Sequence, residues 1–171
     1  MVSFPSLVGA LHQRGVRFVL IGVWGANFHA PDASAVFTTL DYDLFLPPEA
    51  DNVLEAWRVC DDLGLSLRAG AEPLATPRDH LLAAAVVEHC AVVRATAVSG
   101  LTVDLTVVMT AFDFEQVWNE RRTFLVDEIE VPVARLSHII RSKAAAGREK
   151  DRLFLAIHAE ALRQMLDGDE E

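Results

Sequence analysis

Apolar and polar positions follow two different periods along the chain, and each period predicts one kind of secondary structure. Stretches with apolar residues three and four positions apart are expected to be helices, and short apolar runs ended by glycine or proline are expected to be strands. The expected helices span residues 4–13, 24–30, 49–63, 81–89, 113–119, 135–146 and 149–166. The expected strands span residues 17–21, 40–46, 65–68, 91–98 and 101–109, with one or two more within 123–133. This mixture favours an α/β (α+β) fold in which helices flank one mixed sheet.

A β-hairpin is the clearest local motif. The runs 91–98 and 101–109 flank Ser99 and Gly100, and a two-residue turn that contains glycine is typical of hairpins. Side chains on the two strands of a hairpin interact, so Arg94 is a candidate partner for Asp104.

The length and composition are those of an ordinary globular domain. The chain has 171 residues, of which 51% are hydrophobic and 23% are charged, and it shows no internal repeat, low-complexity tract or linker. A chain of this length buries most of its apolar side chains in one core. We therefore expect a single domain over residues 1–171, with a C-terminal helical part over 134–167.

The charge of the chain limits its partners. With 25 acidic and 15 basic residues, the formal net charge is -10. Such a surface repels the phosphate backbone of nucleic acids, which argues against a general nucleic-acid-binding module. A small anionic substrate stays open, because a local Mg²⁺ ion or a cluster of Lys and Arg overrides the overall field. Part of the acidic excess lies in residues 167–171, which we expect to be a frayed, solvated end.

Targeting signals and cysteines are uninformative about chemistry and point to the cytoplasm. The N-terminus lacks the basic stretch and apolar core of a signal peptide, and no apolar run is long enough to span a bilayer. Cys60 and Cys90 form neither a C-x-x-C pair nor a zinc pattern, so both are expected to be reduced and buried. We therefore expect a cytoplasmic protein without a membrane partner.

Three aspartates in the expected strands are the first candidates for a functional site. Because side chains alternate along a strand, Asp41 and Asp43 project from one face, whereas Tyr42 and Leu44 project from the other. Asp104 lies in a strand otherwise suited to burial, where an unpaired carboxylate costs roughly several kcal/mol. If the two strands are neighbours, the three carboxylates converge on one patch.

Such a patch suits Mg²⁺-assisted phosphoryl transfer. Two metal ions about 4 Å apart hold the attacking and leaving oxygens of an in-line displacement, and a third carboxylate serves as general base. Gly22 ends an expected buried strand and opens a helix, where a glycine lets the backbone approach a phosphate closely. The alternatives are solvated acids on an edge strand for Asp41 and Asp43, and a salt bridge to Arg94 for Asp104.

Several short motifs follow one another in a characteristic order. They are Ile21-Gly22 before an expected helix, Thr39-x-Asp41-x-Asp43, Asp104 on a distal strand, Lys143, and Gly147-Arg148-x-Lys150-Asp151. This order resembles the DNA polymerase β nucleotidyltransferase superfamily, over roughly the whole chain. The chain looks most similar to the minimal nucleotidyltransferases and to the AbiEii-like toxin and antitoxin proteins of bacteria.

The resemblance implies a nucleotidyltransferase-like domain that moves NMP from an NTP, with ATP as the expected donor, to an acceptor hydroxyl. Asp41, Asp43 and Asp104 would hold Mg²⁺, and Asp104 would also be the candidate base. Gly22 would lie under the triphosphate, and Lys143 would reach the phosphates or stabilise the site, although a solvated helix face is its alternative. The residues implied to tie the last two helices together are Arg148, Lys150 and Asp151.

Two positions depart from the family's pattern and keep a second function open. Val23 stands where the family usually has glycine or serine, and Phe37 stands where relatives often carry a basic residue. The acceptor stays open, because a small hydroxylated molecule, a protein side chain and an RNA end all fit this chemistry. The alternative is a nucleotidyltransferase-fold protein with weak or no catalysis that binds a toxin or antitoxin partner.

Overall fold

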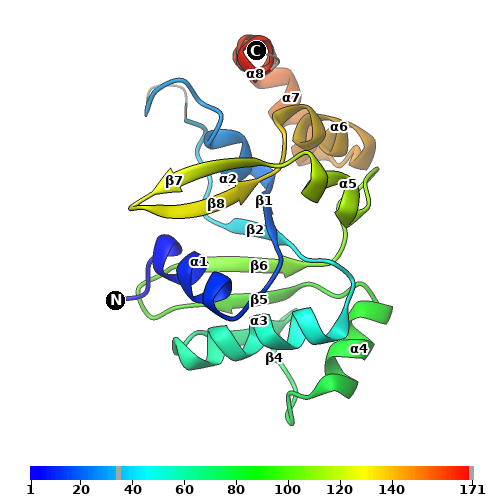
Figure 1. Cartoon of the computed structure of the whole chain (residues 1–171). Helices are drawn as coiled ribbons and strands as arrows, with labels where there is room; N and C mark the ends of the chain where they lie inside the picture. The colour runs from blue at the N-terminus through cyan, green and yellow to red at the C-terminus, as the bar shows by residue number, and fades with distance from the viewer. Residues whose placement is uncertain (34–35, 170–171) are drawn as a thin grey trace.

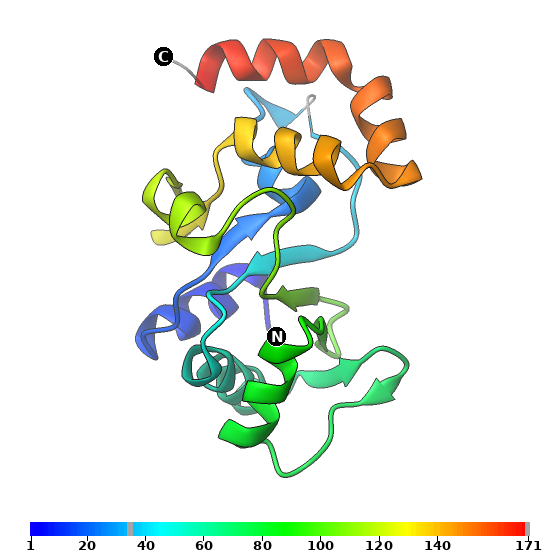
Figure 2. The ribbon, with the colours of Figure 1, turned by 90° about the vertical axis from the view of Figure 1, so that its right-hand side faces the viewer.

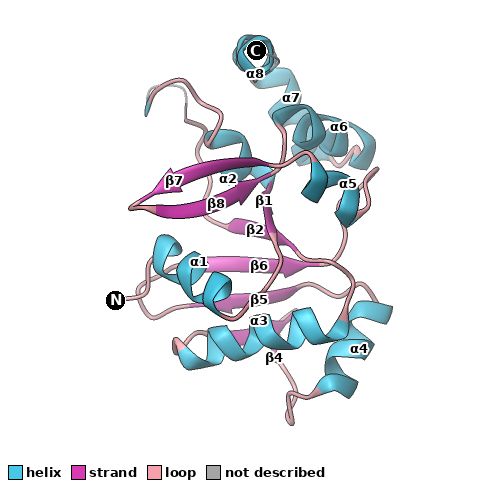
Figure 3. Ribbon diagram, viewed as in Figure 1, coloured by secondary structure: helices cyan, strands magenta, loops and turns pink. Residues whose placement is uncertain are grey.

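One mixed sheet runs through the computed structural model, which describes residues 1–33 and 36–169. Its eight strands are β1 (Val19–Ile21), β2 (Tyr42–Phe45), β3 (Ser66–Ala69), β4 (Glu72–Pro73), β5 (Val93–Thr96), β6 (Thr102–Thr106), β7 (Arg122–Val126) and β8 (Ile129–Val133). Their order across the sheet is β4-β3-β5-β6-β2-β1-β8-β7, and Figure 3 shows β7 and β8 above β2, β6 and β5, with β4 lowest. Strand β2 is parallel to β6 and β1 is parallel to β8, whereas the other neighbours are antiparallel.

Within the same residues, eight helices lie around the sheet (Figure 1). They are α1 (Phe4–Gln13), α2 (Gly22–Asn27), α3 (Ala50–Asp62), α4 (His80–Glu88), α5 (Phe114–Asn119), α6 (Leu136–Ala146), α7 (Glu149–Ile157) and α8 (Ala159–Asp169). Figure 2 shows α6, α7 and α8 at one end of the molecule and α3 and α4 at the other, with strands between them.

The central strands β1 and β2 separate two apolar cores, because successive side chains point to opposite faces. Leu20 and Leu44 belong to the first core, together with α1, α3 and α4. Ile21 and Phe45 belong to the second core, together with α5, α6 and α8. Strand β6 adds Leu105 to the first core, but its other face carries only polar side chains. The second core therefore ends at β2, and a polar surface begins beside it.

Most expected elements are present with ends shifted by one to three residues. The hairpin consists of β5 and β6, and the region 123–133 forms the two strands β7 and β8. The expected two-residue turn of the hairpin is wrong, because the backbone N–H of Ala97 donates to the carbonyl oxygen of Leu101 and residues 98–100 form the loop. Helices flank one mixed sheet, so the expected fold class is confirmed. No helix in the described part of the chain is long and apolar enough to cross a membrane.

The expected helix over 149–166 is wrong, because the structure has two helices that meet at His158. The ring of His158 lies 4.5 Å from that of Phe37 and 5.0 Å from that of Phe154. These contacts turn the chain so that α8 crosses back over the second core, where Leu162 and Met165 are buried. The bend is a tertiary effect, since the local sequence favours helix throughout.

The acidic tail is also more ordered than expected over its first residues. Residues 167–169 belong to α8, and the side chain of Asp169 is buried. Arg122 on β7 donates from Nε to its carboxylate at 3.4 Å and from Nη2 to its carbonyl oxygen at 2.8 Å. Residues 170 and 171 lie outside the described residues.

Candidate functional site

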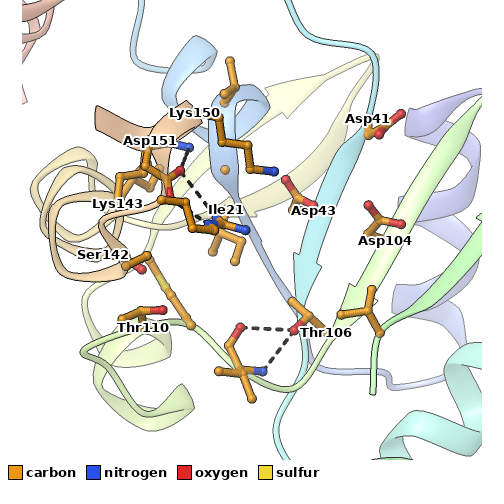
Figure 4. Close-up of a pocket in the computed structure, with 18 of the residues that line it drawn as sticks. Ile21, Asp41, Asp43, Asp104, Thr106, Thr110, Ser142, Lys143, Lys150 and Asp151 are labelled. Carbon is orange, nitrogen blue, oxygen red and sulfur yellow. Dashed lines mark hydrogen bonds and ion pairs between the residues drawn. The ribbon is translucent and has the colours of Figure 1, made fainter. Parts of the chain in front are cut away.

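The register of the strands brings the three candidate aspartates together. Asp43 on β2 lies opposite Asp104 on β6, and Ile21 on β1 lies opposite Asp43 on its other side. Asp41 directly precedes β2. Figure 4 shows the three carboxylates around the same space, which lies where the second core ends. We call Asp41, Asp43 and Asp104 the carboxylate row.

Arg94 extends this row by one more strand. It lies on β5 opposite Asp104, and its Nε and Nη2 atoms donate to the two carboxylate oxygens of Asp104 at 2.8 and 3.0 Å. Nη2 also donates to Oδ2 of Asp41 at 3.0 Å. The hydrogen bonds to Asp104, followed by its charge, raise the pKa of Arg94 above its ordinary value. The salt bridge to Asp104 that was the alternative interpretation is therefore present, and the guanidinium also reaches Asp41.

Asp43 lies deeper than a surface carboxylate. Its burial, followed by the nearby charge of Asp104, raises the pKa of Asp43 from 3.8 to about 6. The charge of Lys143 and, more weakly, that of Lys150 oppose this rise. A cation bound beside Asp43 would offset both causes, because it replaces lost hydration and compensates the neighbouring negative charge.

Gly22 lies directly against Asp43. Its φ angle of +71° falls in the left-handed region that side chains rarely adopt, and a Cβ atom there would collide with the carboxylate of Asp43. Gly22 begins α2 immediately after β1, so it places the first turn of this helix beside the carboxylate row. Its position fits the expected approach of a phosphate, and the contact with a triphosphate stays a prediction.

Basic side chains from the C-terminal helices face the carboxylate row. Lys143 Nζ on α6 lies 3.6 Å from Asp151 Oδ1 on α7, and Arg148 Nε donates to Asp151 Oδ2 at 2.7 Å. Burial acts to raise the pKa of Asp151, but the hydrogen bond from Arg148 and the charge of Lys143 outweigh it and lower that pKa. Asp151 thus links α6 to α7. Lys150 instead lines the cavity, and Figure 4 shows its side chain extending toward Asp43.

The carboxylate row and the basic side chains line one cavity of about 910 Å³. Burial lowers the pKa of Lys143, whose ammonium group lies between Asp151 and this space. Cys90, which was expected to be buried, is exposed and lines the cavity, whereas Cys60 is buried as expected. Hydroxyl and apolar side chains complete the lining; among them are Thr39, Thr106, Thr110, Ser142, Val92, Val108, Met109 and Ile139.

The donor atoms of the row suit a hard divalent cation, but the ligands are not preformed. Carboxylate oxygens are the ligands that Mg²⁺ prefers, and three carboxylates meet here. Among residues 1–33 and 36–169, however, no three His, Cys, Asp or Glu side chains are arranged to hold a metal ion. Arg94 occupies oxygens of Asp41 and Asp104 instead. A metal ion in this row therefore requires local rearrangement of side chains.

The two positions that depart from the family's pattern have different surroundings. Val23 lines the cavity beside Gly22. Phe37 is buried in the second core, where its ring lies edge-on to that of Phe154 at 5.1 Å. The side chain of Asn27 exchanges two hydrogen bonds with the backbone of Phe37. Phe37 therefore has a structural role, and only Val23 bears on what the cavity holds.

Some lining residues were not identified from the sequence. The contact between Arg94 and Asp41 depends on the order of β5, β6 and β2, which no local pattern encodes. Thr106 could have been found, because it shares a face of β6 with Asp104. Ser142 had no signal, and Lys150 was implied to tie the last two helices together rather than to line the cavity, since the placement of both depends on the angle between α6 and α7.

Solved nucleotidyltransferase-like structures share this fold. The chain is similar to the lincosamide antibiotic adenylyltransferase LnuA, solved with lincomycin bound, with a TM-score of 0.57 and 10% sequence identity over 93% of each chain. It is also similar to an antigenic nucleotidyltransferase-like protein from Paracoccidioides brasiliensis, with a TM-score of 0.54 and 14% identity, over 94% of this chain and 72% of that one. No protein-family model and no curated protein sequence matches the chain.

These likenesses show that the chain has a nucleotidyltransferase-like fold, as its motifs predicted. At such low identity they show the fold alone. The narrower resemblance to the AbiEii-like toxin and antitoxin proteins stays a prediction, and so do the roles of the individual site residues.

Proposed function

We propose that this chain is a Mg²⁺-dependent nucleotidyltransferase that moves NMP from an NTP to an acceptor hydroxyl. The observation that carries the proposal is the register of β2 and β6, which sets Asp43 beside Asp104 with Asp41 next to them. The same cavity is lined by Lys143 and Lys150. Carboxylates that suit a hard cation and ammonium groups that suit phosphate oxygens therefore face one space.

In the proposed reaction, the acceptor hydroxyl oxygen attacks the α-phosphorus of the NTP. The new phosphorus–oxygen bond forms as the bond from the α-phosphorus to the bridging oxygen breaks, and pyrophosphate leaves. Asp104 accepts the hydroxyl proton, and Lys143 stabilises the charge that passes to the pyrophosphate. Asp41, Asp43 and Asp104 would hold Mg²⁺, which supplies charge neutralisation at the phosphates. Gly22 would lie under the triphosphate.

We infer that ATP is the donor and that the acceptor is a small hydroxylated molecule. The likeness to LnuA, an adenylyltransferase solved with lincomycin, supports this pair. The cavity of about 910 Å³ lies within the range of small-molecule sites, roughly 300–1,000 Å³. The net charge of -10 disfavours an RNA acceptor.

A transfer assay tests the proposal. The protein is incubated with each NTP, labelled at the α-phosphate, and with a panel of hydroxylated small molecules, with and without Mg²⁺. We expect labelled acceptor only with Mg²⁺, and Asp41→Asn should lower its rate at least about a hundredfold. Asp127→Asn in the β7–β8 turn removes the same charge far from the cavity and should leave the rate unchanged. Undiminished transfer by Asp41→Asn would contradict the proposal.

The second candidate function is partner binding by a nucleotidyltransferase fold with weak or no catalysis. It is favoured by Val23, whose apolar side chain lines the cavity where the family usually has glycine or serine. Valine cannot donate a side-chain hydrogen bond to phosphate. A purified chain that binds no Mg²⁺-ATP, yet forms a stoichiometric complex with a toxin or antitoxin protein, would support this function. Robust turnover in the transfer assay would remove it.

A further inference from the structure

Arg94 lies where a bound cation would be expected in the carboxylate row. Its Nη2 atom donates to Oδ2 of Asp41 and to Oδ2 of Asp104, both at 3.0 Å, and its Nε donates to Oδ1 of Asp104 at 2.8 Å. One guanidinium on β5 thus contacts Asp104 on the adjacent strand β6 and Asp41, which directly precedes β2. Strand β2 lies next to β6 in the sheet. The oxygens it uses belong to two of the three implied metal ligands.

Arg94 and a metal ion compete for these oxygens. Two cations at contact distance repel each other strongly, more so beside a half-buried group such as Asp43 than in bulk water. The side chain of Arg94 is 48% exposed, whereas that of Asp104 is 17% exposed, so the ion pair is partly open to solvent and its contribution to stability is modest. Repulsion by a divalent cation would therefore displace the guanidinium, and the displaced side chain can extend into solvent.

Arg94 also stabilises the row when no metal ion is bound. Asp43 and Asp104 lie in register on adjacent strands, where like charges destabilise a sheet. A planar guanidinium with several donors satisfies two carboxylates at once, which a lysine ammonium matches less well. Arg68 lies opposite Arg94 on the neighbouring strand β3, but it donates to the carbonyl oxygen of Ala71. Arg68 therefore has the charge of Arg94 and lies beside it, without its carboxylate contacts.

We propose that Arg94 is an internal counter-cation of the carboxylate row, which holds Asp41 and Asp104 in the free protein and leaves them when a divalent cation enters. Arg94 is in this sense a positioning residue that sets the threshold for metal binding. The inference rests on the proposed function, because it assumes that the row binds a divalent cation.

Direct binding of Mn²⁺ to the protein without nucleotide tests this inference. The free Mn²⁺ concentration is followed by electron paramagnetic resonance in wild type, Arg94→Gln, Arg94→Lys and the control Arg68→Gln. We expect Arg94→Gln to bind Mn²⁺ on the order of tenfold more tightly than wild type, because a competing cation is lost. Arg94→Lys should fall between them, and Arg68→Gln should bind as wild type does.

The sign of the effect separates competition from a merely structural role. If Arg94 only held the row in shape, Arg94→Gln would bind Mn²⁺ more weakly, and that result would overturn the inference. Equal binding by wild type and Arg94→Gln would also overturn it, and the proposed function would stand as long as Asp41→Asn lost Mn²⁺. Absence of Mn²⁺ binding in every protein, Arg94→Gln included, would overturn both.

Thermal unfolding gives an independent readout. In a chelator, Arg94→Gln should unfold at a lower temperature than wild type, because the row has lost its counter-cation. Saturating Mn²⁺ should close this gap, and it should not change any difference between wild type and Arg68→Gln. A gap that persists with Mn²⁺ bound would contradict the exchange of one cation for the other.

Discussion

Strand β2 contributes in opposite ways at Tyr42 and Leu44 on one face and at Asp43 on the other, where only Phe45 is buried in the second core. On one face Tyr42 is stacked between Phe4 and Trp24, with ring centroids 3.9 and 4.7 Å from its own, and Leu44 is fully buried. On the other face, Asp43 lies in register with another carboxylate. The first arrangement stabilises the fold through apolar burial, whereas the second brings like charges together.

This contrast supports the proposal that the carboxylate row binds a ligand. Asp43 is half-buried and its pKa is raised to about 6, so its charge is unfavourable in the folded protein above that pH. Nearby cationic groups, among them Arg94 and Lys143, compensate the row only in part. An arrangement that lowers stability and lines a large cavity is typical of functional sites.

Shortening Leu44 should have the largest effect, because it removes a fully buried side chain from the apolar face. We expect Leu44→Ala to lower the free energy of unfolding by about 3 kcal/mol. Urea denaturation followed by circular dichroism measures this change. A loss below about 1 kcal/mol would mean that the two faces of β2 do not differ as described.

Removing the charge of Asp43 should have the opposite sign. Because the folded protein holds the proton of Asp43 more tightly than the unfolded chain, this group's contribution to stability falls as the pH rises from about 4 to about 6, and it stays low above that. Asp43→Asn should therefore raise the free energy of unfolding at pH 7 by up to about 3 kcal/mol. Urea denaturation at several pH values checks both the increase and its window.

Asp104→Asn is the matched control on the neighbouring strand. It removes one charge of the same row but also deprives Arg94 of its bidentate partner. We expect little or no gain in stability from it. A gain equal to that of Asp43→Asn would show that total charge, rather than the burial of Asp43, sets the cost of the row.

A methyl group at Gly22 should have a smaller effect. Gly22 and Gly64 both have φ angles in the left-handed region, but a Cβ atom at Gly22 would meet Asp43, whereas at Gly64 it would meet open space. Gly64→Ala should lower the free energy of unfolding by about 1 kcal/mol, and Gly22→Ala should lower it further. Thermal unfolding compares the two. Equal losses would rule out a destabilising contact with Asp43.

The carboxylate row was accessible from the sequence because local rules place most of it. Alternation sets Asp41 and Asp43 on one face of a strand. The expected two-residue turn would set Ala95 opposite Asp104, and it is the observed loop, one residue longer, that sets Arg94 there. The pairing of β2 with β6 is long-range. Convergence of the three carboxylates was therefore predicted only on the condition that these two strands are neighbours. The family resemblance, rather than periodicity, suggested that the condition holds.

Other features depended on packing that no local pattern encodes. The break between α7 and α8 at His158 follows from contacts with Phe37, which lies more than a hundred residues away. Lys150 was expected to tie two helices together, but the angle between α6 and α7 places it along the cavity. Sequence reasoning thus located the acidic half of the site better than its basic half.

Thermal unfolding with nucleotides is the decisive experiment for the carboxylate row. Wild type and Asp41→Asn are heated with ATP, GTP, CTP or UTP, with and without Mg²⁺. A ligand at about 100 times its Kd raises the free energy of unfolding by about 2.7 kcal/mol, which shifts the midpoint by several degrees in a chain of this size. We expect ATP to stabilise wild type only with Mg²⁺, and Asp41→Asn to lose that shift. No shift in wild type at saturating nucleotide and Mg²⁺, or the same shift in Asp41→Asn, would contradict a metal-dependent nucleotide site here.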